Sequence, residues 1–177
     1  MLLRAVNVGG HGVVRPKALA ERLSRYELIN VGAAGSFVAR KGGTPEGLRA
    51  AILAALGFET DVIILTSSEF SRLLAGGPAG WDAPDAETRR FVSFLAADPL
   101  HQPRLPLLRP EGAPWEVQIV ARVGRAVLSL RRRPTDPPLL YPNPLVEKAF
   151  GVPATTRGWE TVLALDELRG PPKITSR

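Results

Sequence analysis

Apolar residues in the first 75 positions form short runs and helical stripes, separated by glycine, proline and polar turns. Short apolar runs bounded by such turns predict four strands, at residues 2–8, 27–31, 36–40 and 61–65. Between them, leucine or isoleucine recurs every four residues after a proline, which predicts two helices, beginning near Pro16 and at Thr44-Pro45. The predicted order is therefore β-α-β-β-α-β.

This order is that of the ferredoxin-like fold, an antiparallel four-stranded sheet with two helices on one face. The link of about four residues between the second and third strands is too short for a crossover, so these strands must pair antiparallel. Thr66-Ser67-Ser68-Glu69 then has the sequence of a capping box, which predicts a short helix through about Leu74. We expect a first ferredoxin-like subdomain over residues 1–75.

The second half is predicted to be an imperfect copy of the first. A connector rich in glycine and proline, residues 76–88, precedes the second subdomain, residues 89–177. Strands are predicted at 90–96, 116–121 and 125–131, and helices at about 144–150 and 157–169. In this interpretation the copy lacks most of its first helix, and a helix replaces its final strand. The expected fold class is α+β, with two ferredoxin-like halves and antiparallel sheets that carry helices on one face.

The composition excludes several kinds of chemistry. The 177 residues include no cysteine, so disulfides, thiolate nucleophiles and cysteine metal sites are excluded. His11 and His101 are far apart and no acidic cluster stands out, so we predict no metal site and no cofactor. No apolar run reaches about 18 residues, and Met1 is followed by a strand-like segment instead of a signal peptide. We therefore expect a cytoplasmic protein without a membrane partner.

The net charge of +6 lies entirely in the second half of the chain. Residues 1–88 carry nine basic and nine acidic side chains, whereas residues 89–177 carry fourteen basic and eight acidic ones. Nineteen of the 23 basic residues are arginine. Arginine binds phosphate in a bidentate manner, but codons rich in G and C favour arginine as well. The charge thus suggests an anionic partner without identifying it.

Two polar segments predict an anion site. After the first strand, a glycine turn can direct backbone amides at a phosphate, and before the closing helix two hydroxyls and a guanidinium stand at the predicted N-terminus. The candidate ligand-binding residues are Arg4, Asn7, Gly9, Gly10, His11, Thr155, Thr156 and Arg157. The simpler interpretation is a tight turn in the first segment and a helix cap at Thr156 in the second.

The predicted hairpin of the second half suggests nucleic-acid binding as an alternative. Four arginines could follow a phosphate backbone: Arg122, Arg125, Arg131 and Arg133. Strand alternation places the last three on one face. The strand at 125–131 has no aromatic residue on which bases could stack, so a charged sheet edge that resists aggregation is the other explanation.

No catalytic residue is predicted. The chain has no G-x-S-x-G motif, and His11 is the one candidate general base, with an exposed loop imidazole as its simpler role. We therefore prefer a non-catalytic binding protein for an anionic, phosphate-bearing ligand. The alternatives are a nucleic-acid-binding module, an enzyme acting on a small phosphorylated substrate, and an oligomeric structural or regulatory protein. The partner is unknown, and a homo-oligomer stays open.

The two ends of the chain resemble a known family. Residues 2–10 read LLRAVNVGG and residues 154–162 read ATTRGWETV. They resemble the L-R-G-I-N-V-G-G opening and the A-T-T-R-N-W-x-T-V close of the bacterial domain-of-unknown-function family 1697. The resemblance implies a two-part α+β fold of ferredoxin-like halves, and it implies no reaction. Polar groups of the family pattern are replaced here, for example at Val13 and Gly158, and a glycine of the pattern is Ala5; the lost polar groups weaken an enzymatic interpretation.

Overall fold

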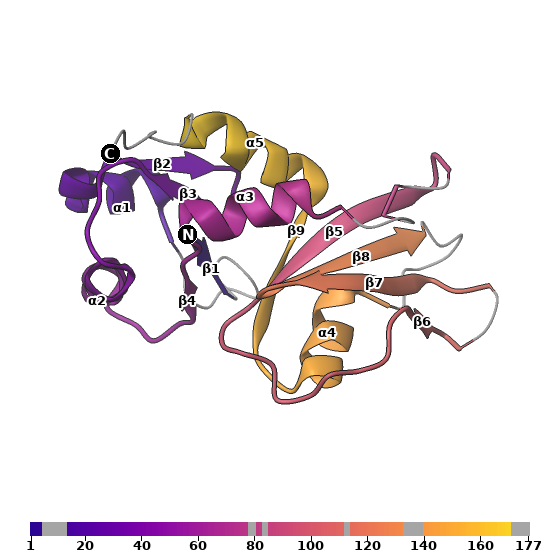
Figure 1. Cartoon of the computed structure of the whole chain (residues 1–177). Helices are drawn as coiled ribbons and strands as arrows, with labels where there is room; N and C mark the ends of the chain where they lie inside the picture. The colour runs from indigo at the N-terminus through magenta and orange to yellow at the C-terminus, as the bar shows by residue number, and fades with distance from the viewer. Residues whose placement is uncertain (5–13, 78–80, 83–84, 112–113, 133–139, 171–177) are drawn as a thin grey trace, which may run out of the picture. The chain divides into compact units, whose positions relative to one another are not determined.

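The computed structural model describes residues 1–4, 14–77, 81–82, 85–111, 114–132 and 140–170. Within these residues the chain is an α+β protein with a four-stranded sheet, a five-stranded sheet and five α-helices (Figure 1). Contacts divide it into two compact units, one of Met1–Phe70 with the chain from Thr161 and one of Ser71–Glu160. The predicted subdomain limits stay predictions. The contact division differs from them by assigning the chain from Thr161 to the first unit.

The sheet of the first unit has the strand order β2-β3-β1-β4, and all neighbours pair antiparallel. Its strands are β1 (Leu2–Leu3), β2 (Leu28–Val31), β3 (Ser36–Ala39) and β4 (Val62–Ile63). Between them lie α1 (Pro16–Arg22), the 3-10 turn η1 (Ser24–Tyr26) and α2 (Pro45–Leu56). The predicted β-α-β-β-α-β order is confirmed with shorter strands, and residues 5–8 of the first predicted strand lie outside the described residues.

One face of this sheet encloses a core with α1 and α2. Strand alternation sends Leu3, Phe37 and Val62 to this face, and Phe37 is fully buried. Leu19 of α1 and Ile52 of α2 belong to the same cluster. The four-residue spacing that predicted these helices therefore marks the surfaces by which they pack.

The predicted helix ends are also present. Thr44 accepts a hydrogen bond of 3.1 Å from the Gly47 amide at the start of α2, and Gly57 ends that helix with φ of 73°. At the start of α3 (Ser67–Ala75), the Thr66 amide donates to Glu69 Oε2 at 2.8 Å, and the Glu69 amide donates to Thr66 Oγ1 at 3.2 Å. These two reciprocal bonds are the expected capping box.

The sheet of the second unit has the strand order β6-β7-β8-β5-β9, again with antiparallel neighbours. Its elements are β5 (Thr88–Leu95), β6 (Leu107–Arg109), β7 (Val117–Val123), β8 (Ala126–Arg132), α4 (Pro142–Phe150) and β9 (Ala154–Gly158). The predicted first strand and the hairpin are confirmed. The short strand β6, in the proline-rich stretch, was not predicted from the sequence.

The prediction that helix replaces the final strand of the second half is wrong. Residues Ala154–Gly158 form β9, which pairs with β5, and α5 (Trp159–Arg169) begins two residues later than expected. Thr155 and Thr156 are β-branched, so they suit a strand as well as a helix cap. The backbone groups along the edge of β5 require partners, and β9 supplies them.

β8 is the middle strand of this sheet, and all of Ala126–Leu130 is buried. On one face Val127 forms a core with Leu95 of β5, Ala154 of β9, and Val146 and Phe150 of α4. A strand covered on both faces is mainly apolar, and Ser129 is the single polar residue in this stretch of β8. Charged residues can therefore occur only near the ends of β8.

The capping box at α3 gives a first prediction. Thr66→Ala removes the hydroxyl that accepts from the Glu69 amide, so we expect the free energy of unfolding to fall by about 1 kcal/mol. Thr66→Ser keeps the hydroxyl and is the matched control, for which we expect little loss. Urea unfolding followed by circular dichroism measures both, and equal losses for the two variants would contradict the capping role.

Candidate functional site

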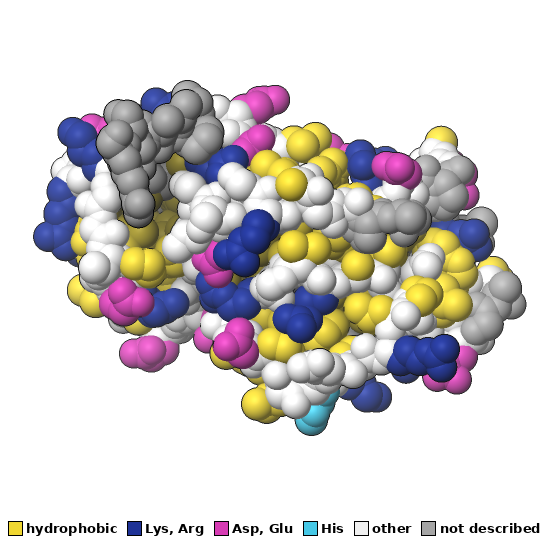
Figure 2. All heavy atoms as spheres, viewed as in Figure 1, with side chains coloured by type: hydrophobic (Ala, Val, Ile, Leu, Met, Phe, Trp, Pro, Cys, Tyr) yellow, Lys and Arg dark blue, Asp and Glu magenta, His cyan; other side chains and the backbone are white. Residues whose placement is uncertain are grey.

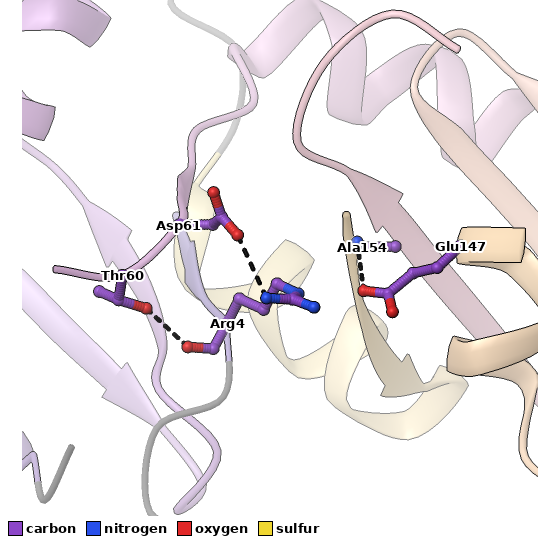
Figure 3. A network of polar contacts seen from close by, with 5 residues as sticks. All are labelled: Arg4, Thr60, Asp61, Glu147 and Ala154. Atoms are coloured by element: carbon purple, nitrogen blue, oxygen red, sulfur yellow. Dashed lines mark hydrogen bonds and ion pairs between the residues drawn. The ribbon is translucent and has the colours of Figure 1, made fainter. Parts of the chain in front are cut away.

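Arg4 of the first unit already has partners within the protein. Its Nη1 lies 3.4 Å from Asp61 Oδ2, and its carbonyl accepts a 2.7 Å hydrogen bond from Thr60 Oγ1 (Figure 3). The Arg4 side chain is 34% exposed, and such a pair typically contributes ~1 kcal/mol or less. The carboxylate of Asp61 nevertheless reduces the attraction of Arg4 for an added anion.

The glycine turn of the predicted anion site lies outside the described residues. This applies to Asn7, Gly9, Gly10 and His11. Their part in ligand binding stays a prediction.

Thr155, Thr156 and Arg157 lie in β9, not at a helix start. Arg157 is 7% exposed, and its Nη1 donates to Thr155 Oγ1 at 2.7 Å and to the Thr156 carbonyl at 2.8 Å. Burial lowers the pKa of the Arg157 guanidinium to about 10, so the side chain remains charged at pH 7. Arg4 and these residues belong to different units, and a single site that includes both stays a prediction.

Thr156 lies on the opposite face of β9 and joins a small hydroxyl network. Its Oγ1 donates to Asn143 Oδ1 at the start of α4, at 2.9 Å, and lies 2.6 Å from Ser93 Oγ on β5. Because the Thr156 hydroxyl has one proton, Ser93 must be the donor in the second contact. The network connects two strands to a helix and therefore serves the fold.

The predicted nucleic-acid residues do not form one continuous stripe. Arg122 and Arg125 lie at the β7–β8 turn, where Arg122 Nη1 donates to the Gly124 carbonyl at 2.7 Å. Arg131 lies near the other end of β8, six residues and thus ~20 Å from Arg125. Arg133 lies outside the described residues. Because β8 is a middle strand, the explanation as a protected sheet edge is wrong for Arg131.

Arginines gather instead where β8 ends and β5 begins. The register pairs Arg89 of β5 directly with Arg131 of β8. Arg89, Phe91, Arg131 and Arg132 line a cavity of about 280 Å³, which we call the basic pocket. Like charges directly opposite each other on neighbouring strands repel. An anion between Arg89 and Arg131 would remove this repulsion.

Uncharged groups in the described part of the chain orient two of the arginines of the pocket, Arg131 and Arg132. Arg131 Nε donates to the Leu140 carbonyl at 3.0 Å, and the guanidinium carbon lies 4.2 Å from the centre of the Tyr141 ring. The guanidinium carbon of Arg132 lies 4.2 Å from the centre of the Trp115 ring. Aromatic rings attract cations but carry no net charge, so the pocket stays electropositive.

Two guanidinium nitrogens at the pocket have unused donors. Arg131 Nη2 and Arg132 Nε are buried, and neither has a hydrogen-bond partner in the described part of the chain. A buried donor without an acceptor costs about 1–3 kcal/mol. Arg132 has an acidic cross-strand neighbour, since its amide donates to the Glu116 carbonyl at 2.9 Å. Arg89 and Arg131 are therefore the principal cations of the basic pocket.

The sequence alone identified Arg131 but not Arg89, Phe91 or Tyr141. The available signal was consecutive arginines beside each of two apolar runs, two at Arg89-Arg90 and three at Arg131-Arg132-Arg133. Nothing in the sequence fixes the register that places Arg89 opposite Arg131. The pairing of β5 with β8 had to be known first.

A cavity of about 100 Å³ in the first unit is a weaker candidate. Its lining is mainly apolar and includes Leu2, Phe37 and Phe70. Arg169, which also lines it, donates to the Ser67 carbonyl and to Asp166 Oδ1, each at 2.7 Å. The charge of Arg169 is thus balanced within the protein.

The surface charge offers no simple guide to the site. On the face shown in Figure 2, Lys and Arg side chains are dispersed among acidic, apolar and other groups. Among the described residues, no three histidine, aspartate or glutamate side chains are grouped as a metal site. In the same part of the chain, every helix is too short or too polar to span a membrane.

The described chain is thus an α+β protein with two antiparallel sheets, one of which carries a basic pocket. The family described as "Protein of unknown function (DUF1697)" matches residues 1–124, and the chain belongs to this family. The family indicated by the terminal motifs is thereby confirmed, although the closing motif at 154–162 lies beyond the matched residues. No match was found among curated proteins or among solved structures.

The hydroxyl network gives a second prediction. Thr156→Val keeps the size of the side chain but removes its hydroxyl, so Ser93 and Asn143 lose their shared partner. We expect the free energy of unfolding to fall by about 1–3 kcal/mol. In a Ser93→Ala background, Thr156→Val should lower the free energy of unfolding by at least ~0.5 kcal/mol less than it does in the unmodified protein. Urea unfolding of the four proteins measures this coupling, and strictly additive losses would contradict a shared network.

Proposed function

We propose that this protein binds a phosphate-bearing anionic ligand in the basic pocket and catalyses no reaction on it. The observation that carries the proposal is the direct cross-strand pairing of Arg89 with Arg131. A phosphate between them would accept charge-assisted hydrogen bonds from both guanidinium groups. The attraction of both guanidinium groups to the anion would then offset their repulsion of each other.

The arrangement of Arg131 supports tight binding. Its hydrogen bond to the Leu140 carbonyl and its contact with Tyr141 restrict the side chain before any ligand arrives. Restriction in advance lowers the entropy that binding must remove. Nη2 is buried and has no other hydrogen-bond partner in the described part of the chain.

The start of α4 adds to the positive potential. Tyr141 is the N-cap residue of α4, its side chain makes no capping bond, and the first turn contains no acidic residue. The N-terminal end of a helix carries a partial positive charge. Because Arg131 stacks on Tyr141, this helix end lies close to the arginines of the pocket.

Binding is a better proposal than catalysis for this pocket. Its described lining consists of arginine and phenylalanine side chains. Neither type serves as a nucleophile or as a general base near neutral pH. The predicted site is the weaker location, because Arg4 and Arg157 are already bonded within the protein.

We also infer that the two sheets are related as ferredoxin-like halves, the second imperfect. The order β4-β1-β3-β2 in the first unit corresponds to β9-β5-β8-β7 in the second, with β6 added at the edge. The segment that contains β6 takes the place of the helix expected between the first two strands. The matching strand orders support this relationship.

Phosphate binding gives a third prediction. Titration of the whole chain with inorganic phosphate in a calorimeter should show one site, and phosphate should raise the melting temperature. Arg131→Gln removes the charge but keeps a polar side chain, and we expect phosphate affinity to fall about ten-fold or more. Arg89→Gln should act in the same direction.

Arg122→Gln is the matched control for the charge change. Arg122 is exposed, lies at the β7–β8 turn and is distant from the pocket along the strand. We expect the Arg122→Gln protein to bind phosphate with the same affinity as the unmodified protein at moderate salt. Equal weakening by all three substitutions would indicate a general charge effect and would overturn the proposed site.

A further inference from the structure

We infer that the phosphate-bearing ligand of the basic pocket is single-stranded nucleic acid, an inference that rests on the proposed function. It depends on aromatic side chains beside the phosphate-binding arginines. A free phosphate cannot stack on such rings, whereas a nucleic acid carries a flat base next to every phosphate.

Tyr141 is the first of these rings. The residue is 53% exposed, although the Arg131 guanidinium lies against the ring. Tyrosine, with an apolar ring and a polar hydroxyl, is enriched at binding interfaces. A base stacked on the exposed part of the Tyr141 ring would bring its own phosphate close to Arg131.

Phe91 is the second ring. It is two residues from Arg89 on β5, so both side chains lie on the same face, ~7 Å apart along the strand. Both line the basic pocket together with Arg131. The pocket thus places an aromatic ring beside charged groups, a combination that sites for single strands use.

The sequence argued against nucleic-acid binding because the strand at 125–131 has no aromatic residue, but other segments supply aromatic rings here. The residues from Arg125 to Arg131 contain no aromatic side chain, but Tyr141 and Trp115 come from other segments and stack on Arg131 and Arg132. Arginine stacked on a ring presents a flat, charged surface that also suits a base. The positive charge of residues 89–177 would attract the rest of the strand.

A single strand fits this pocket better than a duplex. Bases inside a duplex are stacked on each other, so their faces are not available to protein rings. The cavity of about 280 Å³ is at the lower limit of small-molecule sites. It can hold one phosphate with part of a nucleotide while the remainder of the strand lies outside.

Fluorescence anisotropy with labelled dT and U octanucleotides tests the inference on the whole chain. We expect both to bind with similar affinity, because stacking on Tyr141 does not involve the 2′-hydroxyl. A plot of log affinity against log salt concentration should have a slope near −0.7 for each phosphate contacted. An unlabelled hairpin duplex should compete poorly.

Tyr141 variants separate stacking from charge. Tyr141→Leu should weaken octanucleotide binding by about 5- to 150-fold, the range of one base stack, and should weaken inorganic phosphate binding much less, because phosphate loses only the restriction that the ring places on Arg131. Tyr141→Phe keeps the ring and should bind the octanucleotides nearly as the unmodified protein does. Equal loss of phosphate and octanucleotide binding in Tyr141→Leu would overturn the stacking role.

The outcomes distinguish this inference from the proposed function. If inorganic phosphate binds in an Arg131-dependent manner but neither octanucleotide does, the inference is wrong and the proposed function stands. Preference for the duplex would also overturn it. If neither phosphate nor octanucleotide binds, both are wrong.

Discussion

The burial of β8 on both faces is the constraint on which the second unit depends. Strands β7 and β5 flank β8, and residues Ala126–Leu130 are withdrawn from water. A charge in this stretch would require desolvation without a partner, at a cost of several kcal/mol. Cations on β8 are therefore confined to its end, and the antiparallel partner β5 begins there with an arginine of its own. The same pairing that builds the sheet creates the electrostatic strain that a ligand can relieve.

Local chemistry made much of the fold predictable. Thr44, Gly57 and the Thr66–Glu69 capping box act through bonds within a few residues, so their roles follow from the sequence and recur in the structure. The prediction for β9 was wrong for the opposite reason. Its threonines suit a helix cap or a strand. Which of the two forms depends on pairing with the edge of β5, about 60 residues earlier in the chain. Long-range pairing overrides a local preference whenever the two are close in free energy.

The site was less predictable than the fold, because it depends on register. The arginine excess of the second half was visible in the sequence, as was the possible contact of Arg131 with phosphate. The partners of Arg131 come from β5 and from the segment before α4, and no local pattern joins them. Conversely, Arg157 looked like a ligand-binding residue, yet in the structure it is buried and bonded to its own strand.

A crystal structure of the whole chain grown with phosphate tests the central claim most directly. The account predicts density for the anion between the guanidinium groups of Arg89 and Arg131, within hydrogen-bond distance of both. It also predicts that Arg131 keeps its contact with Tyr141. An empty basic pocket in crystals that hold phosphate elsewhere, for example beside Arg4 or at the glycine turn, would contradict it.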